Sequence, residues 1–548
     1  MKTTKFFLMA ALALTLAACS SDDRSALPLD PVKNDILNPA QTAKGEGIPF
    51  TATISIDNGA TTRAITENGT TLETSWAEGD KVALIHNSVS DEMTVSSVSG
   101  GVATITGTIT GSPSGGDDVT IIYPSNAADG TTGNVKADLL YAQDGTLTGT
   151  GGTSIEEKYD VRKGTGTLNA SGTSLSGTVS LTNQFAIFKF TVKNSDASAT
   201  IDVKPLTITI GAQDYVITPS SATSTLYAVL PAVSSQTVSF SASGSDNKAY
   251  TCSKDGVTFA AAKYYQSTLK MAEISGALGG LFSVSASKKA FFSKGNLQAT
   301  YDGATWTWAF AANQYDYIGN AAANTSINGN GTVSANGTVD LFGWVGANSS
   351  FAGTAQYGIS NSTAISEYGN TGGESLKTDW GNLAITNGGN AANSGWRTLT
   401  RDEWTYLFDT RESGSTVFGT ENGRYAQATI NTDGTGVNGV ILFPDGVTIT
   451  ADKVSTAGTV NGSSAYATKC TTAQWTALES RGCVFLPAAG HRNGSSVTGA
   501  GSDGRYWSGK AYVTNDAYNV TFNSGKLNPE DNHYCYLGYS VRLVRPAE

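Results

Sequence analysis

The N-terminal half of the chain repeatedly alternates hydrophobic and polar residues, which is the period-two pattern of a half-buried β-strand. The clearest case is residues 50–56, where Phe50, Ala52, Ile54 and Ile56 share one face. Further strand patterns follow at residues 75–85, 101–109, 119–124, 185–192, 225–231 and 264–269. Together they predict a mainly β fold of short strands and tight turns.

One stretch has a helical period instead. Thr400 followed by Glu403 is a capping box, so a helix is expected to begin near Arg401. The apolar positions beyond it have helical spacing: Trp404, Leu407 and Phe408. Because such a helix must cover a sheet, residues 281–548 are expected to form an α+β domain.

Other parts of the C-terminal half carry strand or loop patterns. Residues 291–297 and 306–310 are expected to pair as a hairpin, and residues 320–339, almost wholly small and polar, to form a long loop. Residues 539–546 have the pattern of a closing strand. The glycine-containing residues 271–280 are expected to be a short linker.

The first residues have the pattern of an export signal. Lys2 and Lys5 precede an apolar run, and Leu16-Ala17-Ala18-Cys19 matches a lipobox. Residues 1–19 are therefore a predicted lipoprotein signal peptide, with lipid on Cys19; the alternative is a plain secretory signal. Residues 20–47 are polar and aperiodic, which predicts a flexible tether.

Composition narrows the choice of partners. The chain has 62 Gly and only 15% charged residues, as expected for an exported β-rich protein of several domains. Its formal net charge of -11 argues against nucleic acid and against an anionic membrane surface, because both require clustered Lys and Arg.

A first resemblance covers residues 47–271. Arg63 in a loop, the Trp76-x-x-Gly79-Asp80 turn, Tyr123-Pro124 and Tyr227–Pro231 follow in an order that resembles the fimbrillin family of pilus subunits. This resemblance implies two transthyretin-like β-sandwiches, at residues 48–180 and 181–273.

The same resemblance implies a route of assembly by donor-strand exchange. In that family a protease cuts after an Arg that follows the first strand, and a neighbouring subunit's strand fills the groove left behind. Here the bond would be Arg63-Ala64 and the released strand would be residues 50–56. The alternative is an ordinary turn, with the strand retained.

A second resemblance covers residues 281–548. Its pieces are similar in type and order to C-type-lectin-like domains of secreted anaerobe proteins: Trp396–Thr400, Glu403-Trp404, Phe485–Gly490, Tyr506–Ser508 and Ser540–Arg545. Within it, aromatic, guanidinium and amide side chains that could bind a glycan or a protein gather in residues 489–530. The predicted ligand residues are His491, Arg492, Arg505, Tyr506, Trp507, Tyr512, Asn515 and Asp516. The alternative for Trp507 is a place in the core.

No cofactor or metal site is expected. Residues 528–532 contain the ingredients of a calcium-dependent lectin motif in the wrong order, although their oxygen atoms could still hold calcium. Cys470, Cys483 and Cys535 allow at most one disulfide in this domain, and a predicted helix at residues 472–481 separates the first two. The pairing stays open, and Cys252 stands apart.

Catalysis is not expected. Sulfatase-activating oxidases use cysteines on a related fold, but Cys483 lies in an apolar context that would raise its thiol pKa. The only imidazoles are His86, His491 and His533, and no spacing of Ser, His and Asp indicates a triad.

The sequence therefore favours a surface lipoprotein of the outer membrane that becomes a fimbrial tip subunit and adhesin. Its expected partners are fimbrial stalk subunits, a host or bacterial glycan or protein, and the outer membrane through Cys19. A final strand held within its own domain could not be donated, which suits a tip. The alternative is a glycan-capture lipoprotein that does not polymerise.

Overall fold

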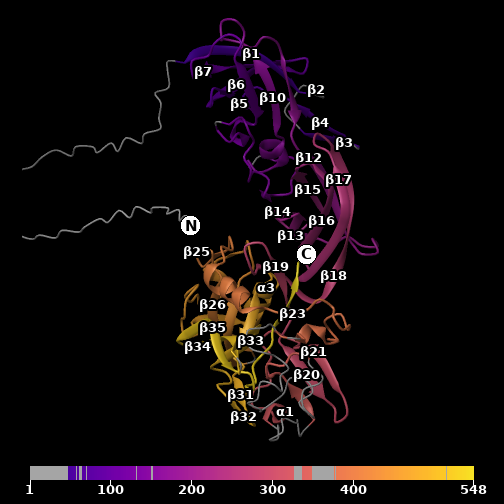
Figure 1. Cartoon of the computed structure of the whole chain (residues 1–548), viewed down its shortest axis with the longest axis vertical. Helices are drawn as coiled ribbons and strands as arrows, with labels where there is room; N and C mark the ends of the chain where they lie inside the picture. Colours follow the sequence, from indigo (N-terminus) through magenta and orange to yellow (C-terminus); the bar gives the residue numbers. More distant parts are fainter. Residues whose placement is uncertain are drawn as a thin grey trace, which may run out of the picture. The chain divides into compact units, whose positions relative to one another are not determined.

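The fold is mainly β, as the alternating pattern predicted (Figure 1). The computed structural model describes residues 47–547 except 57–58, 61–64, 70, 131, 150–151, 326–335, 348–375, 377, 433 and 514. Cys19, Arg63 and Ala64 lie outside the described residues, so the predicted lipidation and cleavage positions have no structural description.

Strand β1 (Ile48–Ile56) is the predicted first strand, and it closes a barrel. Its alternation buries Phe50, Ala52, Ile54 and Ile56, as predicted. The other barrel strands are β5 (Lys81–His86), β6 (Val89–Ser99), β7 (Val102–Ile109), β8 (Asp118–Tyr123), β10 (Arg162–Thr167) and β11 (Val179–Asn183). Their order, β1-β11-β10-β8-β5-β6-β7, returns to β1, so the sheet closes on itself as a barrel, where the resemblance implied a transthyretin-like β-sandwich.

A small sheet follows β1 in the chain. It consists of β2 (Gly59–Ala60), β3 (Thr66–Asn68) and β4 (Thr71–Ser75), in the order β2-β4-β3. Ile65, just before β3, is buried in the core of the middle part of the chain rather than in that of the barrel.

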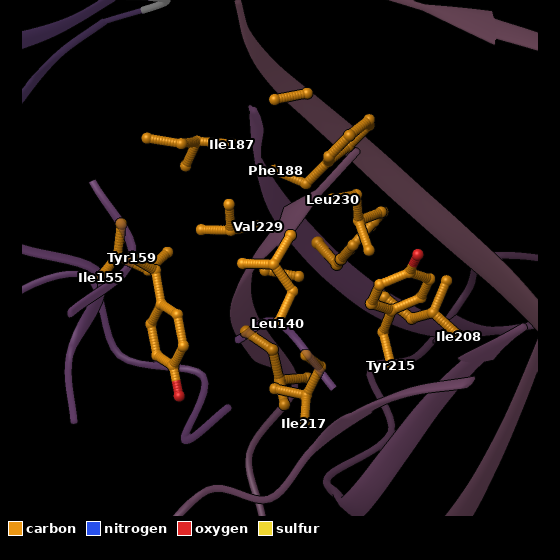
Figure 2. Packing of buried hydrophobic residues seen from close by; sticks show 14 of the residues in the cluster. Leu140, Ile155, Tyr159, Ile187, Phe188, Ile208, Tyr215, Ile217, Val229 and Leu230 are labelled. Carbon is orange, nitrogen blue, oxygen red and sulfur yellow. The ribbon is translucent and has the colours of Figure 1, made fainter. Parts of the chain in front are cut away.

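The middle part has two layers around its own core. One layer contains β12 (Ala186–Asn194), β15 (Thr225–Leu230) and the first half of β18 (Tyr264–Ser283). The other contains β9 (Ala142–Gln143), β13 (Val203–Ile210), β14 (Gln213–Ile217), β16 (Val233–Gly244) and β17 (Lys248–Phe259). Phe190 meets Phe240 across the layers with ring centroids 5.6 Å apart, and Figure 2 shows the neighbouring core with Phe188, Ile208 and Val229.

The boundary between barrel and middle part lies later than predicted. The sequence placed it before Leu181, but β11 pairs with both β1 and β10, and Leu181 is wholly buried in the barrel core. The change therefore occurs at Gln184, between β11 and β12.

The predicted linker at residues 271–280 is wrong, because β18 runs straight through it. Leu278, Leu281 and Phe282 are buried, and β18 continues from the middle part into pairing with β19 (Lys289–Ser293). The glycines there permit close packing rather than flexibility: a Cβ on Gly280 would collide with the carbonyl of Gly482.

The C-terminal part is α+β, as expected, and is built from small sheets and short helices. In chain order, the first elements of this part are β20 (Leu297–Tyr301), β21 (Trp306–Phe310), α1 (Ala322–Thr325), β22 (Gly337–Val339), β23 (Arg397–Thr398), α2 (Arg401–Thr405), β24 (Thr416–Val417), β25 (Thr420–Glu421), β26 (Tyr425–Thr432), β27 (Thr435–Leu442) and β28 (Thr448–Ile449). The remaining ones are β29 (Thr468–Thr471), α3 (Thr472–Glu479), β30 (Val484–Pro487), β31 (His491–Asn493), β32 (Ser496–Thr498), β33 (Gly504–Val513), β34 (Asp516–Asn523), β35 (Lys526–Tyr534) and β36 (Leu543–Pro546).

Three local predictions in this part differ in their outcome. The capping box of Thr400 and Glu403 is present, and α2 starts at Arg401 as predicted. The predicted hairpin is wrong, since β21 pairs with β20 while residues 289–293 join β18 and β36 in another sheet. The predicted loop at 320–339 also contains α1 and β22.

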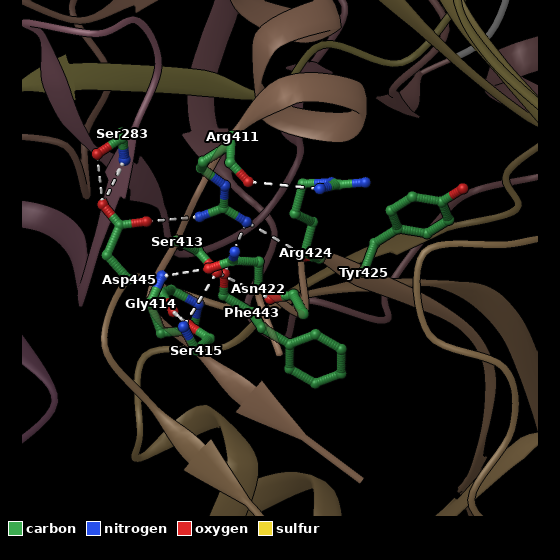
Figure 3. A network of polar contacts seen from close by, with 12 residues as sticks. Ser283, Arg411, Ser413, Gly414, Ser415, Asn422, Arg424, Tyr425, Phe443 and Asp445 are labelled. Carbon is green, nitrogen blue, oxygen red and sulfur yellow. Dashed lines mark hydrogen bonds and ion pairs between the residues drawn. The ribbon is translucent and has the colours of Figure 1, made fainter. Parts of the chain in front are cut away.

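A buried ion pair fastens the end of β18 to the C-terminal part (Figure 3). Arg411, which is wholly buried, donates to Asp445 at 2.8 Å and to the carbonyl of Phe443 at 2.9 Å. The other oxygen of Asp445 accepts from the backbone amide and hydroxyl of Ser283, at 2.8 and 2.6 Å. The strand that crosses from the middle part thus ends on a fixed polar contact.

Candidate functional site

The first candidate site is the position that β1 occupies in the barrel. β1 pairs antiparallel with β7 from Ile48 to Ser55, and parallel with β11 from Ile54 to Ile56. Both edges of β1 therefore form backbone hydrogen bonds, although its ladder with β11 is much shorter than its ladder with β7. Burying each large side chain of such a strand contributes about 1.5–3 kcal/mol. If β1 left, the backbone groups of β7 and the pockets of its side chains would become open to another strand.

Glu67 holds the segment after β1 in place independently of β1. Its carboxylate accepts from Lys189 at 2.8 and 2.9 Å, from the hydroxyls of Tyr227 and Tyr264 at 2.9 Å each, and from Gln266 at 3.0 Å. These partners belong to β12, β15 and β18. The hydrogen bond from Lys189, with those of Tyr264 and Tyr227, lowers the pKa of Glu67 despite its burial. Residues from Ile65 onward are therefore anchored on the middle part.

Replacing Glu67 by glutamine is expected to loosen the β3–β4 hairpin. The neutral amide loses the ion pair with Lys189 and one of the two acceptor oxygens, so the amide protection of residues 66–75 should fall by about tenfold. Because the folded pKa of Glu67 lies below its ordinary value of 4.5, the stabilisation is complete above that pH and is lost as the pH falls through the lower folded pKa. Hydrogen exchange measures both effects.

Glu73 provides the matched control on the same hairpin. It is exposed and bonds only locally in the described chain, to Asn68 at 3.0 Å. Glu73→Gln should leave the protection of the hairpin unchanged. Equal loss of protection in both variants would mean that the Glu67 contacts do not anchor the hairpin.

The second candidate site is the end of the chain. β36 lies between β19 and β23 and pairs with both, and Leu543 and Val544 are wholly buried. Arg542, just before it, is wholly buried and donates to Gln314 at 2.6 Å. The predicted closing strand is thus present at residues 543–546, and it is occupied within its own part of the chain.

The predicted ligand residues divide into three groups: wholly buried, half-buried and surface residues. Arg492, Tyr506 and Trp507 are wholly buried, so the prediction that they contact a ligand is wrong. Their polar atoms bond inside the protein: the indole of Trp507, for example, donates to the carbonyl of Phe342 at 2.7 Å. Sequence alone could not separate them from surface residues, because aromatic and Arg side chains are used in both places.

His491 and Arg505 belong to a half-buried polar cluster. Arg505 donates to His533 at 2.9 Å and to the hydroxyl of Tyr539 at 3.0 Å, and the ring of His491 packs against the edge of Tyr539. Burial and the neighbouring Arg505 lower the pKa of His491 to about 4 and also lower that of His533. The imidazole of His491 is therefore neutral at pH 7.

Tyr512, Asn515 and Asp516 are the predicted ligand residues that lie at the surface. Tyr512 and Asn515 are exposed, and Asp516 is partly exposed, near the turn between β33 and β34. Burial raises the pKa of Asp516. Sequence analysis missed Tyr534, which only the register of β34 with β35 places opposite Asp516, and Tyr536, which stacks on Tyr534.

The carboxylates near the weak calcium motif are engaged elsewhere. Glu530 pairs with Arg401 at 2.8 Å, and Asp531 lies 3.7 Å from Lys526. Within the described ranges, no three carboxylate, imidazole or thiol side chains group as metal ligands. In that same part of the chain, none of the helices is long and apolar enough to span a bilayer.

The four described cysteines are all free thiols: Cys252, Cys470, Cys483 and Cys535. Burial raises the pKa of Cys252 to about 11 and that of Cys470 to about 12, and it raises those of Cys483 and Cys535 further. In the folded protein at pH 8, iodoacetamide should therefore label these thiols slowly, and all four should label after unfolding in guanidinium without reductant. Mass spectrometry reads the added groups; fewer additions would indicate a disulfide.

Comparisons with known proteins give distant similarities only. No protein-family model and no curated protein matches the sequence. Among solved structures, a fimbrial assembly protein from Parabacteroides distasonis is 13% identical, with a TM-score of 0.24 over 45% of this chain and 94% of its own. The tip fimbrial protein Mfa3 from Porphyromonas gingivalis is 9% identical, with a TM-score of 0.21 over 41% and 95%. A candidate cell adhesion protein from Bacteroides ovatus is 13% identical, with a TM-score of 0.25 over 41% and 96%. Similarities at this level establish no family for the chain.

Proposed function

We propose that the chain is a terminal, ligand-binding subunit of a fimbrial-type surface appendage. In this proposal a protease cuts at Arg63-Ala64, β1 leaves the barrel, and the extended strand of one neighbouring subunit takes its place. The chain reaches the cell surface as a lipoprotein through Cys19. It binds rather than catalyses, and its C-terminal part carries the ligand.

One observation carries the proposal: the chain that follows β1 is anchored on the middle part separately from β1. β1 closes the barrel with a long ladder on β7 and a short one on β11, and the chain after it is anchored separately through Ile65 and Glu67. β36 is paired on both sides, as β1 is, but it continues directly from the buried Arg542, so in this proposal it stays in its own sheet. In this proposal such a subunit accepts a strand in place of β1 and keeps β36 in its own sheet.

The side chains of β1 define what an incoming strand must present. The inward positions hold Phe50, Ala52, Ile54 and Ile56, of which Ala52 is the small one. A replacing strand should therefore be apolar at alternate positions and small at the second of them, because an overpacked core is also costly. It should run antiparallel to β7, as β1 does.

Trypsin cleavage followed by N-terminal sequencing tests the proposal. We expect a new N-terminus at Ala64 and no such product from the Arg63→Gln variant. Cleavage elsewhere only, or none, would remove the processing step. A monomer that keeps its first strand on the cell surface would instead favour the alternative of a glycan-capture lipoprotein.

A further inference from the structure

Large exposed hydrophobic side chains gather at one end of the β33–β34–β35 sheet. The described residues contain four of them, Tyr141, Tyr512, Val513 and Tyr534, and three belong to this end. Tyr512, Val513 and Tyr534 are 46%, 47% and 52% exposed. Tyr141, the fourth, is 37% exposed and lies in the middle part. We call Tyr512, Val513, Asp516, Tyr518 and Tyr534 the tyrosine patch.

The strand register places these side chains on one face. Val513 pairs with Asp516, and Asp516 pairs with Tyr534, so the three lie in one row across the sheet. A β-bulge between Ala511 and Val513 turns Tyr512 to the same side, where its ring meets that of Tyr518 at 5.2 Å.

The opposite face of the same sheet end is closed. Ala511, Ala517 and Cys535 are buried there. The rings on the outer face are also held in place: Tyr534 stacks on Tyr536 with centroids 5.4 Å apart, and Arg401 lies over Tyr518 at 5.2 Å. Rigid rings lose little conformational entropy when a ligand binds.

Asp516 adds an unmet hydrogen-bond acceptor to the patch. Its Oδ1 is buried and has no hydrogen-bond partner within the described chain. A buried acceptor without a hydrogen bond lowers the stability of the protein, and the hydroxyl group of a ligand could supply the missing donor. Ring faces next to a hydroxyl acceptor are suited to a molecule with both C–H faces and hydroxyl groups.

We propose that the tyrosine patch binds a neutral glycan. Sugar rings stack through their C–H faces on Tyr512 and Tyr534, and a hydroxyl donates to Asp516. Acidic sugars are disfavoured, because the carboxylate of Asp516 lies on this face, the cation of Arg401 over Tyr518 is already paired with Glu530, and the whole chain has a net charge of -11. This inference names the ligand class of the C-terminal part and so rests on the proposed function.

A glycan array probed with the full-length chain tests this inference. The wild type should bind neutral glycans and not their sialylated or sulfated forms. Tyr534→Ala and Tyr512→Ala should each weaken binding by about tenfold, whereas Tyr534→Phe should keep most of it, because the ring face remains. Asp516→Ala should weaken binding without changing the fold, as checked by circular dichroism.

Tyr141→Ala is the matched control, since Tyr141 is the fourth exposed large side chain and lies in the middle part, against Tyr215. It should bind as the wild type does. Binding to no glycan, binding only to acidic glycans, or binding indifferent to Tyr534 would overturn the inference, as would patch-dependent capture of a protein alone. None of these results bears on cleavage at Arg63-Ala64, so the two proposals fail separately.

Discussion

Replacing Arg411 by alanine is expected to lower the free energy of unfolding of the C-terminal part by about 3–5 kcal/mol. The guanidinium is wholly buried, and its removal leaves the carboxylate of Asp445 without its cationic partner. The two backbone carbonyls that it serves, at Phe443 and Arg424, also lose a donor. All tryptophans except Trp76 lie in this part of the sequence, so tryptophan fluorescence in urea reports its unfolding.

Arg401→Ala is the control for this change. Arg401 also pairs with a carboxylate, that of Glu530 at 2.8 Å, but the two side chains are 35% and 45% exposed. Exposed pairs contribute at most about 1 kcal/mol, so the urea midpoint should move little. If the two variants were equally stable, the contact that ends β18 would not hold the C-terminal part together.

Ile54→Ala is expected to destabilise the barrel by about 2–5 kcal/mol, which is the usual cost of truncating a fully buried aliphatic side chain. Ile54 is wholly buried, and it is the first position at which β1 pairs with β7 and β11 together, opposite Ala103 and Val179. The truncation leaves a cavity where β1 bridges its neighbours. The rate of hydrogen exchange at the backbone amides of β7 should therefore rise.

Thr51→Ala serves as the control within the same strand. Thr51 is exposed, and its backbone amide bonds to the carbonyl of Thr173 at 3.2 Å, which alanine preserves. In Thr51→Ala, the backbone amides of the barrel should be as protected from hydrogen exchange as they are in the wild type. An unchanged barrel in Ile54→Ala would indicate that β1 is not required for closure.

The sequence correctly predicted the features that depend only on residues close together in the chain. The capping box needs only Thr400 and Glu403, three residues apart, and it formed as predicted. The alternation in residues 50–56 likewise fixed the buried face of β1, because the period of a strand is set by its own backbone. The helix α3 between Cys470 and Cys483 also formed within its predicted range.

Contacts between distant residues decided the rest. The sequence around Gly280 predicts a linker, because it does not show that Gly482, about two hundred residues further along the chain, packs against Gly280. Tyr506 and Trp507 belong to a strand that buries them, whereas Tyr512 in the same strand is turned outward by a bulge. Tyr534 joins it only through strand register, which neither composition nor spacing contains.

The central claim is that this chain accepts one strand and donates none. Native mass spectrometry of the trypsin-processed protein, alone and with a synthetic peptide of residues 48–56, tests it directly. We predict a monomer without peptide, and a complex with one peptide per chain when the peptide is added. A ladder of chain-to-chain oligomers from the processed protein alone would contradict the claim, because it requires the final strand to leave its place between β19 and β23.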